Sequence, residues 1–110
     1  MVNLGGEVVV DYSIRLKDEY GAEQLWVNGY SNDVPCYIAS RRVIKEGGYE
    51  GETSMYWYNK PSPFAPEVED LIVNAAGELM PSAFKEERPA VNRQETIKKE
   101  ADGSYRLVSW

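Results

Sequence analysis

The residues best suited to chemistry lie in a glycine-rich stretch at positions 29–51. Its carboxyl, phenol, amide, guanidinium and thiol groups alternate with glycine and proline, a composition that predicts a loop. Loops on a rigid scaffold carry many binding and catalytic groups because their backbone can be aimed without disturbing a core. The alternative is a connecting loop with no chemical role. The polar and reactive candidates are Asn32, Asp33, Cys36, Tyr37, Arg41, Arg42, Lys45, Tyr49 and Glu50.

The residue types that are absent limit the chemistry further. The chain of 110 residues has no histidine and one cysteine, so the commonest metal ligand and the commonest general base are both missing. A catalytic zinc site takes about three protein ligands from Cys, His, Asp and Glu. We therefore expect the chain alone to bind no zinc. Cys36 lacks a histidine to activate it, so we do not expect it to act as a nucleophile.

Composition places the chain among small globular domains. It is 43% hydrophobic and 27% charged, with a net charge of −6. An acidic chain is poorly suited to nucleic acid, which is bound through a basic patch. No apolar run approaches the length of a membrane span, and no signal-peptide pattern occurs, so we expect no transmembrane segment and leave the compartment open.

Three motifs, in order over residues 5–80, carry a resemblance to a known family. GGEVVVDYSIRLK at 5–17 combines a GE pair with an RL pair on the following helix. GYSNDVPCY at 29–37 is a G-x-x-N segment that ends in tyrosine, and GGYEG follows at 47–51. Together they resemble the distal part of the catalytic domain of neutral/alkaline ceramidases, zinc-dependent hydrolases of N-acyl sphingoid lipids. Each motif alone would be a weak signal.

The resemblance implies roles for four residues. In the family, zinc is held by two upstream histidines, by the glutamate of the GE motif and by the tyrosine that closes the G-x-x-N segment, which correspond here to Glu7 and Tyr37. Tyr49, twelve positions later, corresponds to a tyrosine that donates a hydrogen bond to the reacting amide oxygen. Asn32 corresponds to a loop-supporting asparagine. Ordinary alternatives are a surface carboxylate for Glu7 and structural aromatic residues for the two tyrosines.

The elements that must position these residues form an α/β fold with one small sheet. A strand at 8–10, a helix at 12–20 and a strand at 24–29 predict a strand-helix-strand crossover unit with parallel strands. A second register ends the first strand at the glycines 5–6 and places Glu7 at a strand end, and the sequence leaves both registers open. If the resemblance holds, we expect Glu7, Tyr37 and Tyr49 to converge at the carboxyl edge of the sheet.

Helix signals complete this part of the chain. Asp11 or Ser13 is expected to cap the first helix, a solvent-facing one, and Ser40 a short helix at 40–46. Residues 53–58, TSMYWY, predict a strand or a flap. An amphipathic helix at 67–80 is expected to cover the sheet. Its predicted core contacts are Leu71, Ile72, Ala75 and Leu79.

The predicted organisation is a partial α/β domain at 1–80, a flexible charged segment at 81–93, and a β-hairpin at 94–110 around Asp102 and Gly103. The first core strand lies so close to Met1 that we expect the upstream half of the catalytic domain to be a separate partner. Arg41, Arg42 and Glu50 are expected to pair and hold the loop.

The interpretation is a distal segment of a ceramidase-like zinc amide hydrolase, inactive alone, with an N-acyl lipid as the substrate that the family implies. Family members are often secreted, periplasmic or membrane-associated. Tight zinc binding by the chain would instead point to a homo-oligomer that completes the site. The alternative interpretation is an independent interaction module without catalysis.

Overall fold

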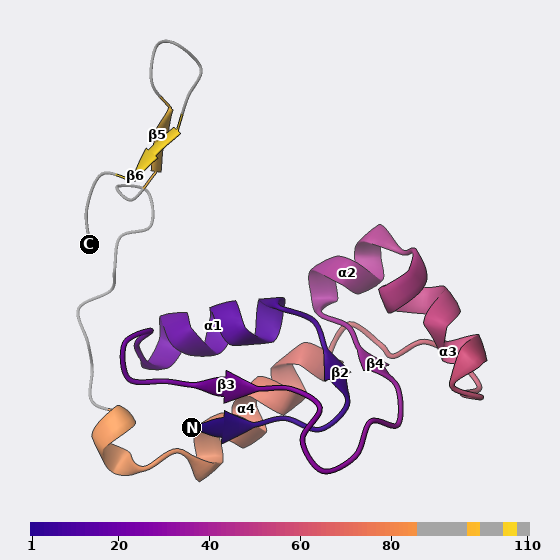
Figure 1. Cartoon of the computed structure of the whole chain (residues 1–110), viewed down its shortest axis with the longest axis horizontal. Coiled ribbons are helices and arrows are strands. Elements are labelled where there is room, and N and C mark those ends of the chain that lie inside the picture. The colour runs from indigo at the N-terminus through magenta and orange to yellow at the C-terminus, as the bar shows by residue number, and fades with distance from the viewer. Residues whose placement is uncertain (86–96, 100–104, 108–110) are drawn as a thin grey trace.

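Short parallel strands and helices make up the fold (Figure 1). The computed structural model describes residues 1–85, 97–99 and 105–107. Strand β1 pairs with β3, and β2 pairs with β4, both in parallel. The mixed α/β class with parallel strands is thus confirmed. The strands are β1 (Val2–Asn3), β2 (Glu7–Val8), β3 (Val27–Asn28) and β4 (Tyr37–Ile38).

The single sheet expected from the sequence is replaced by two separate strand pairs. The interruption lies at Gly6, whose φ of +76° is in the left-handed region that glycine tolerates. A Cβ atom at this position would lie 2.6 Å from Cγ1 of Ile38. The Gly6 amide donates to the carbonyl of Asp33, and its carbonyl accepts from Tyr30. The loop after β3 is therefore bonded to the break between β1 and β2.

Helix α1 (Asp11–Tyr20) connects β2 to β3 and ends at Gly21, with φ of +95°. It was expected to face solvent, but Tyr12 and Leu16 are completely buried. These residues are four positions apart and so share one helix face. The expected cap by Asp11 or Ser13 is also wrong, because Val10 occupies the N-cap without a side-chain hydrogen bond.

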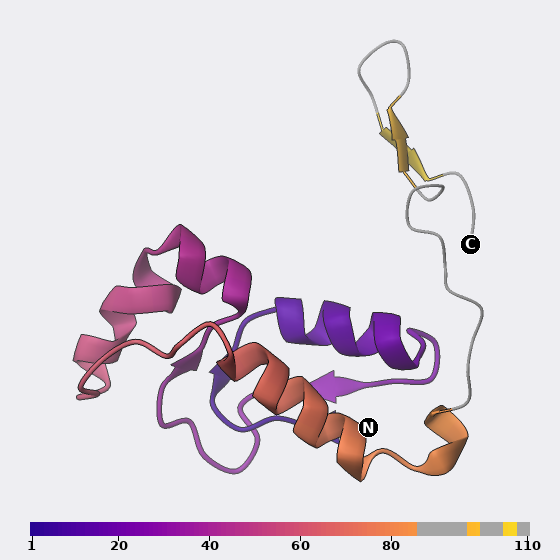
Figure 2. The same cartoon turned by 180° about the vertical axis from the view of Figure 1, so that it is seen from behind.

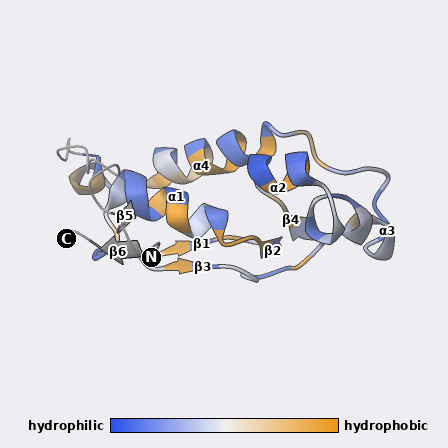
Figure 3. Ribbon diagram, turned by 90° about the horizontal axis from the view of Figure 1, so that it is seen from above, coloured by the Kyte–Doolittle hydropathy of each residue, from blue (hydrophilic) through white to orange (hydrophobic). Residues whose placement is uncertain are grey.

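Helix α4 (Val68–Leu79) lies on the same side of β1 and β3 as α1 (Figure 3). Figure 2 shows it running in front of the strands when the molecule is seen from behind. The expected core contacts are partly wrong, since Leu71 is 68% exposed and Leu79 is 86% exposed. The helix instead buries Val73 and Gly77.

The first turn of α4 explains this orientation. Arg15 of α1 contacts Glu69 at 3.0 Å and Asp70 at 2.7 Å, which anchors α4 against α1 by its acidic residues. Val73 follows Glu69 by four positions and therefore lies on the same face. A Cβ atom at Gly77 would lie 2.5 Å from the Tyr20 hydroxyl, so glycine permits the close approach of the two helices.

Residues 41–57, which follow β4, are mostly helical. Ser40 caps α2 (Arg41–Glu46) by accepting a hydrogen bond from the Val43 amide, as predicted. The π-helix Tyr49–Thr53 and helix α3 (Ser54–Trp57) follow, so the prediction of a strand at 53–58 was wrong. Burial of Ser54 and Met55 fastens α3 to the core. The periodicity of two buried residues followed by two exposed ones suits a helix and not an alternating strand.

The chain continues with the 3-10 turn Ser82–Phe84. Strands β5 (Ile97–Lys99) and β6 (Tyr105–Leu107) pair antiparallel. The predicted turn at Asp102 and Gly103 and most of the predicted flexible segment lie outside the described residues. Among the residues that are described, no helix is long and apolar enough to cross a membrane.

Candidate functional site

The site is built around Glu7, the first residue of β2, which stands opposite Tyr37 in the parallel register of β2 and β4. Both residues are partly exposed. They lie at the beginnings of these strands, just beyond the carboxyl ends of β1 and β3. Glu7 and Tyr37 therefore follow the carboxyl ends of β1 and β3, as expected, but they stand at the amino ends of β2 and β4. The reason is that the chain breaks at Gly5 and Gly6, before Glu7 begins β2.

Two tyrosine hydroxyls donate hydrogen bonds to the Glu7 carboxylate. Tyr30 donates to Oε1 at 2.6 Å, and Tyr58 donates to Oε2 at 3.0 Å. The Tyr37 hydroxyl also acts on this carboxylate from the neighbouring strand and lowers its pKa. The two donors come from the loop after β3 and from the end of α3. Residues distant in sequence therefore share one carboxylate as their acceptor.

Tyr37 is also the centre of the aromatic contacts. Its ring meets that of Tyr49 edge-on at a centroid distance of 5.5 Å, and that of Tyr58 at 6.2 Å. Such edge-to-face pairs are favourable because the positive ring edge meets the negative ring face. The structure thus brings Glu7, Tyr37 and Tyr49 together. We refer to Glu7, Tyr30, Tyr37, Tyr49 and Tyr58 as the tyrosine cluster.

The contacts within the cluster shift the pKa values of Glu7 and Tyr37 in opposite directions. The hydroxyls of Tyr30 and Tyr37 lower the pKa of Glu7, and Tyr58 contributes in the same direction. The Glu7 carboxylate in turn raises the pKa of Tyr37 to about 12. At neutral pH the cluster therefore holds one carboxylate anion and a neutral Tyr37 phenol beside it.

Two other candidates of the loop take structural positions. Asn32 is exposed and has a φ of +68°, a left-handed conformation that asparagine tolerates better than most residues. Cys36 is buried at 3% exposure, and burial raises the pKa of its thiol. A raised pKa lowers the fraction of reactive thiolate.

The expected pairing of Arg41 and Arg42 with Glu50 is not what the structure shows. Arg41 pairs with Asp70 of α4, and its amide donates to Glu69 at 2.7 Å. Arg42 makes ion pairs with Asp11 of α1 at 2.9 Å and with Glu46 at 2.8 Å. Both arginines follow the Ser40 cap and project toward neighbouring helices. They fasten α2 to α1 and α4 and do not close the loop on itself.

The side-chain oxygens of Glu7 and Tyr37 fit part of the coordination shell of a zinc ion. In the described part of the chain, no group of three His, Cys, Asp or Glu residues could hold a metal ion. Glu7 and Tyr37 are adjacent oxygen donors, and zinc accepts oxygen ligands. They fit two positions of a four-coordinate site, and further ligands would have to come from another segment.

Sequence reasoning did not identify Tyr30 and Tyr58. Tyr30 directly follows the glycine that opens the G-x-x-N motif, but its φ of +55°, unusual for tyrosine, could not be foreseen. Tyr58 belongs to the aromatic run that was expected to form a strand. Its helical spacing from the buried Ser54 was the available signal.

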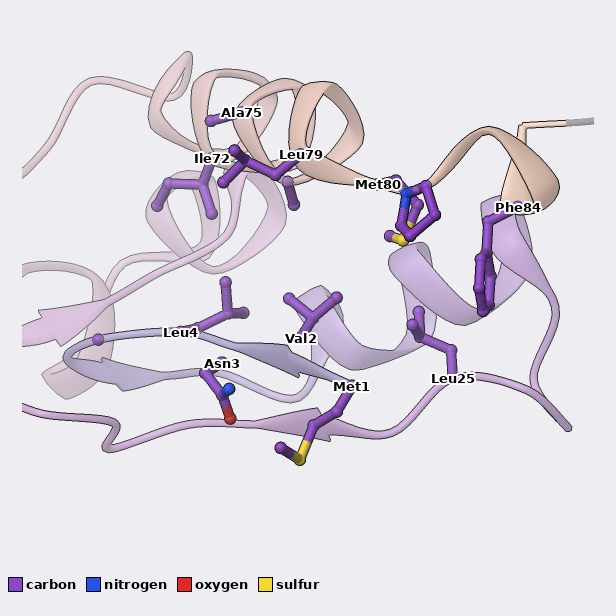
Figure 4. A pocket seen from close by; sticks show the side chains of 13 residues that line it. Met1, Val2, Asn3, Leu4, Leu25, Ile72, Ala75, Leu79, Met80 and Phe84 are labelled. Atoms are coloured by element: carbon purple, nitrogen blue, oxygen red, sulfur yellow. The ribbon is translucent and has the colours of Figure 1, made fainter.

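A second feature is an apolar groove of about 500 Å³ between α4 and β1. Val2 of β1 and Leu4, which directly follows β1, point toward Ile72 and Leu79 of α4 (Figure 4). None of the residues that line the groove belongs to the tyrosine cluster.

Comparison with known proteins gives no match to a family model, a curated protein or a solved structure.

Proposed function

We propose that this chain is the distal segment of a neutral ceramidase-like, zinc-dependent N-acyl amide hydrolase. It would supply Glu7 and Tyr37 to the metal site, lack the histidine ligands, and be inactive alone. The observation that supports the proposal is that Glu7, Tyr37 and Tyr49, three residues singled out from separate motifs, lie together: Tyr37 stands opposite Glu7, and its ring contacts that of Tyr49. The proposal requires this convergence, whereas a generic small α/β domain does not.

In the complete site, zinc would supply a Lewis acid that polarises the amide carbonyl and activates water. The residues of this chain would have three tasks. Glu7 provides a carboxylate that is ionised at neutral pH, and its tyrosine partners hold its pKa below the usual value. Tyr37 provides a phenol oxygen on the neighbouring strand. Tyr49, 47% exposed and in edge contact with Tyr37, would donate a hydrogen bond to the amide oxygen of the substrate.

The missing ligands would come from the upstream half of the catalytic domain. Two features support a missing neighbour of this kind. The groove between β1 and α4 is apolar, and Leu79 beside it is 86% exposed. Within the described residues, strand β1 pairs with β3 alone. Exposed apolar surface of this kind marks interaction sites.

The second candidate is an interaction module without catalysis. It is favoured by the exposed aromatic pair at the end of α3, where Tyr56 is 80% exposed and Trp57 is 74% exposed. Their rings contact each other edge-on at 5.5 Å. Aromatic residues of this kind are enriched at protein interfaces.

Titration calorimetry with zinc chloride at neutral pH tests the proposal. The isolated chain should bind zinc weakly or not at all, because two ligands do not complete a site. Any weak binding should fall with Glu7→Gln or Tyr37→Phe and be unaffected by the control Glu52→Gln, whose carboxylate is exposed. Weak zinc binding that Glu7→Gln does not change would favour the interaction module. Tight stoichiometric binding that Glu7→Gln abolishes would show that an oligomer completes the site.

A further inference from the structure

Tyr58 contacts both residues that the proposed function assigns to the metal. Its hydroxyl donates to Oε2 of Glu7 at 3.0 Å, and its ring lies edge-on to the ring of Tyr37 at 6.2 Å. It follows α3 directly and reaches Glu7 across 51 positions of sequence. One side chain therefore links the two neighbouring strands β2 and β4 at their first residues.

Tyr58 is itself held firmly. Its amide donates to the carbonyl of Ser54 at 3.2 Å, and Ser54 and Met55 are buried. The amide of Lys60 donates to the Met55 carbonyl at 2.9 Å, which closes the end of the helix. The Tyr58 ring is partly buried against the core. A donor on such an element can fix the orientation of its acceptor.

Tyr30 binds the other oxygen of the same carboxylate from a different environment. Its side chain is 60% exposed, and it lies on the loop after β3 with a φ of +55°. Its hydroxyl donates to Oε1 at 2.6 Å. The two oxygens of Glu7 thus have chemically identical partners, one on a buried helix end and one on the solvent side.

We propose that Tyr58 is a positioning residue that fixes Oε2 of Glu7 and the ring of Tyr37, so that Oε1 would be the oxygen available to a metal. Tyr30 donates to Oε1 and would have to release it for a metal to bind there. The inference rests on the proposed function. Its physical basis is that a hydrogen bond to one part of a ligand orients the rest of it and sustains metal affinity. A donor on the ligand oxygen itself competes with the metal.

The same substitution in the two tyrosines should therefore have opposite effects. With zinc chloride as the probe, Tyr58→Phe should lower the weak zinc affinity of the full chain by roughly 10-fold or more, because it removes the orienting hydrogen bond. Tyr30→Phe should strengthen zinc binding by roughly 5-fold, about the worth of one hydrogen bond. The control Tyr56→Phe, at an 80% exposed position, should change nothing.

A measurement without metal decides the positioning role independently. NMR of the chain labelled at glutamate reports the order of the Glu7 side chain through the shift difference of its γ protons. Tyr58→Phe should collapse this difference, and Tyr30→Phe should leave it nearly unchanged. Equal effects, or the reverse order, would overturn the inference, whether or not the chain binds zinc. If the NMR result is as predicted but Glu7→Gln does not change the zinc affinity, the positioning role of Tyr58 stands and the proposed metal function is refuted.

Discussion

Leu16 and Leu71 form a matched pair of leucines on helices α1 and α4, and their substitution tests how α4 is oriented. Leu16 is 0% exposed, whereas Leu71 is 68% exposed. Truncation to alanine removes about three methylene-sized groups, each worth about 0.8 kcal/mol when fully buried. The transfer term for Leu16 is therefore about 2.4 kcal/mol, and the cavity left behind brings the total to about 3 kcal/mol or more.

The same arithmetic gives a small effect for Leu71. About a third of its side chain is covered, so the transfer term is below about 1 kcal/mol, and solvent fills the space that it leaves. Urea unfolding followed by far-UV circular dichroism measures both. With a slope of about 1 kcal/mol per molar urea, the midpoint for Leu16→Ala should fall by roughly 3 M, and that for Leu71→Ala by less than roughly 1 M.

Equal losses, or a larger loss for Leu71→Ala, would refute the packing described for α4. Leu16→Met keeps most of the side-chain volume and should cost less than about 1.5 kcal/mol. This milder variant keeps the comparison measurable if Leu16→Ala does not fold.

Three further predictions test local features. Arg42 holds the pKa of Asp11 below its usual value. The stabilisation from this pair is therefore present above the unfolded pKa of Asp11 and is lost as pH falls through the folded pKa. With Asp11→Asn, the free energy of unfolding should fall less between about pH 5 and about pH 3. Gly6→Ala should lower the thermal midpoint clearly, because φ is +76° and the new Cβ would lie 2.6 Å from a carbon of Ile38, whereas Gly48→Ala, with open space around the Cβ, should lose less. Tyr12→Phe removes the buried bond to the Ala39 carbonyl and should cost about 1 kcal/mol in urea unfolding, and an unchanged midpoint would contradict that bond.

Features set by local chemistry could be predicted from the sequence. The Ser40 cap and the helix over 68–79 depend on neighbouring residues alone, and the structure has both. The helix that ends at Gly21 was foreseen for the same reason. The parallel pairing of strands followed from the succession of strand, helix and strand.

Features set by tertiary contacts could not be predicted. The apolar residues of α4 at three- and four-residue spacing form a face too wide to say which part is buried. Ion pairs from Arg15 to Glu69 and Asp70 select the side that carries Val73. The sequence-based choice of core residues was partly wrong because it included Leu71 and Leu79 on the exposed side, whereas Ile72 does pack against the core.

The residues of the candidate site also divide into those that could be predicted from the sequence and those that could not. The family resemblance singled out Glu7, Tyr37 and Tyr49, and the register of β2 with β4 places the first two opposite each other. Tyr30 and Tyr58 were missed because their approach depends on a left-handed residue and on a helix where a strand was expected. The groove beside β1 likewise arises only when α4 is positioned.

The most direct test of the central claim is the zinc content of this chain in complex with the segment encoded immediately upstream of Met1. The two polypeptides are co-expressed and purified together, and bound zinc is measured by elemental analysis. The account predicts that the upstream segment carries two histidines, that the complex holds one zinc ion, and that Glu7→Gln and Tyr37→Phe each deplete it while Glu52→Gln does not. An upstream segment without histidines, or a zinc content that neither Glu7→Gln nor Tyr37→Phe changes, would contradict the account.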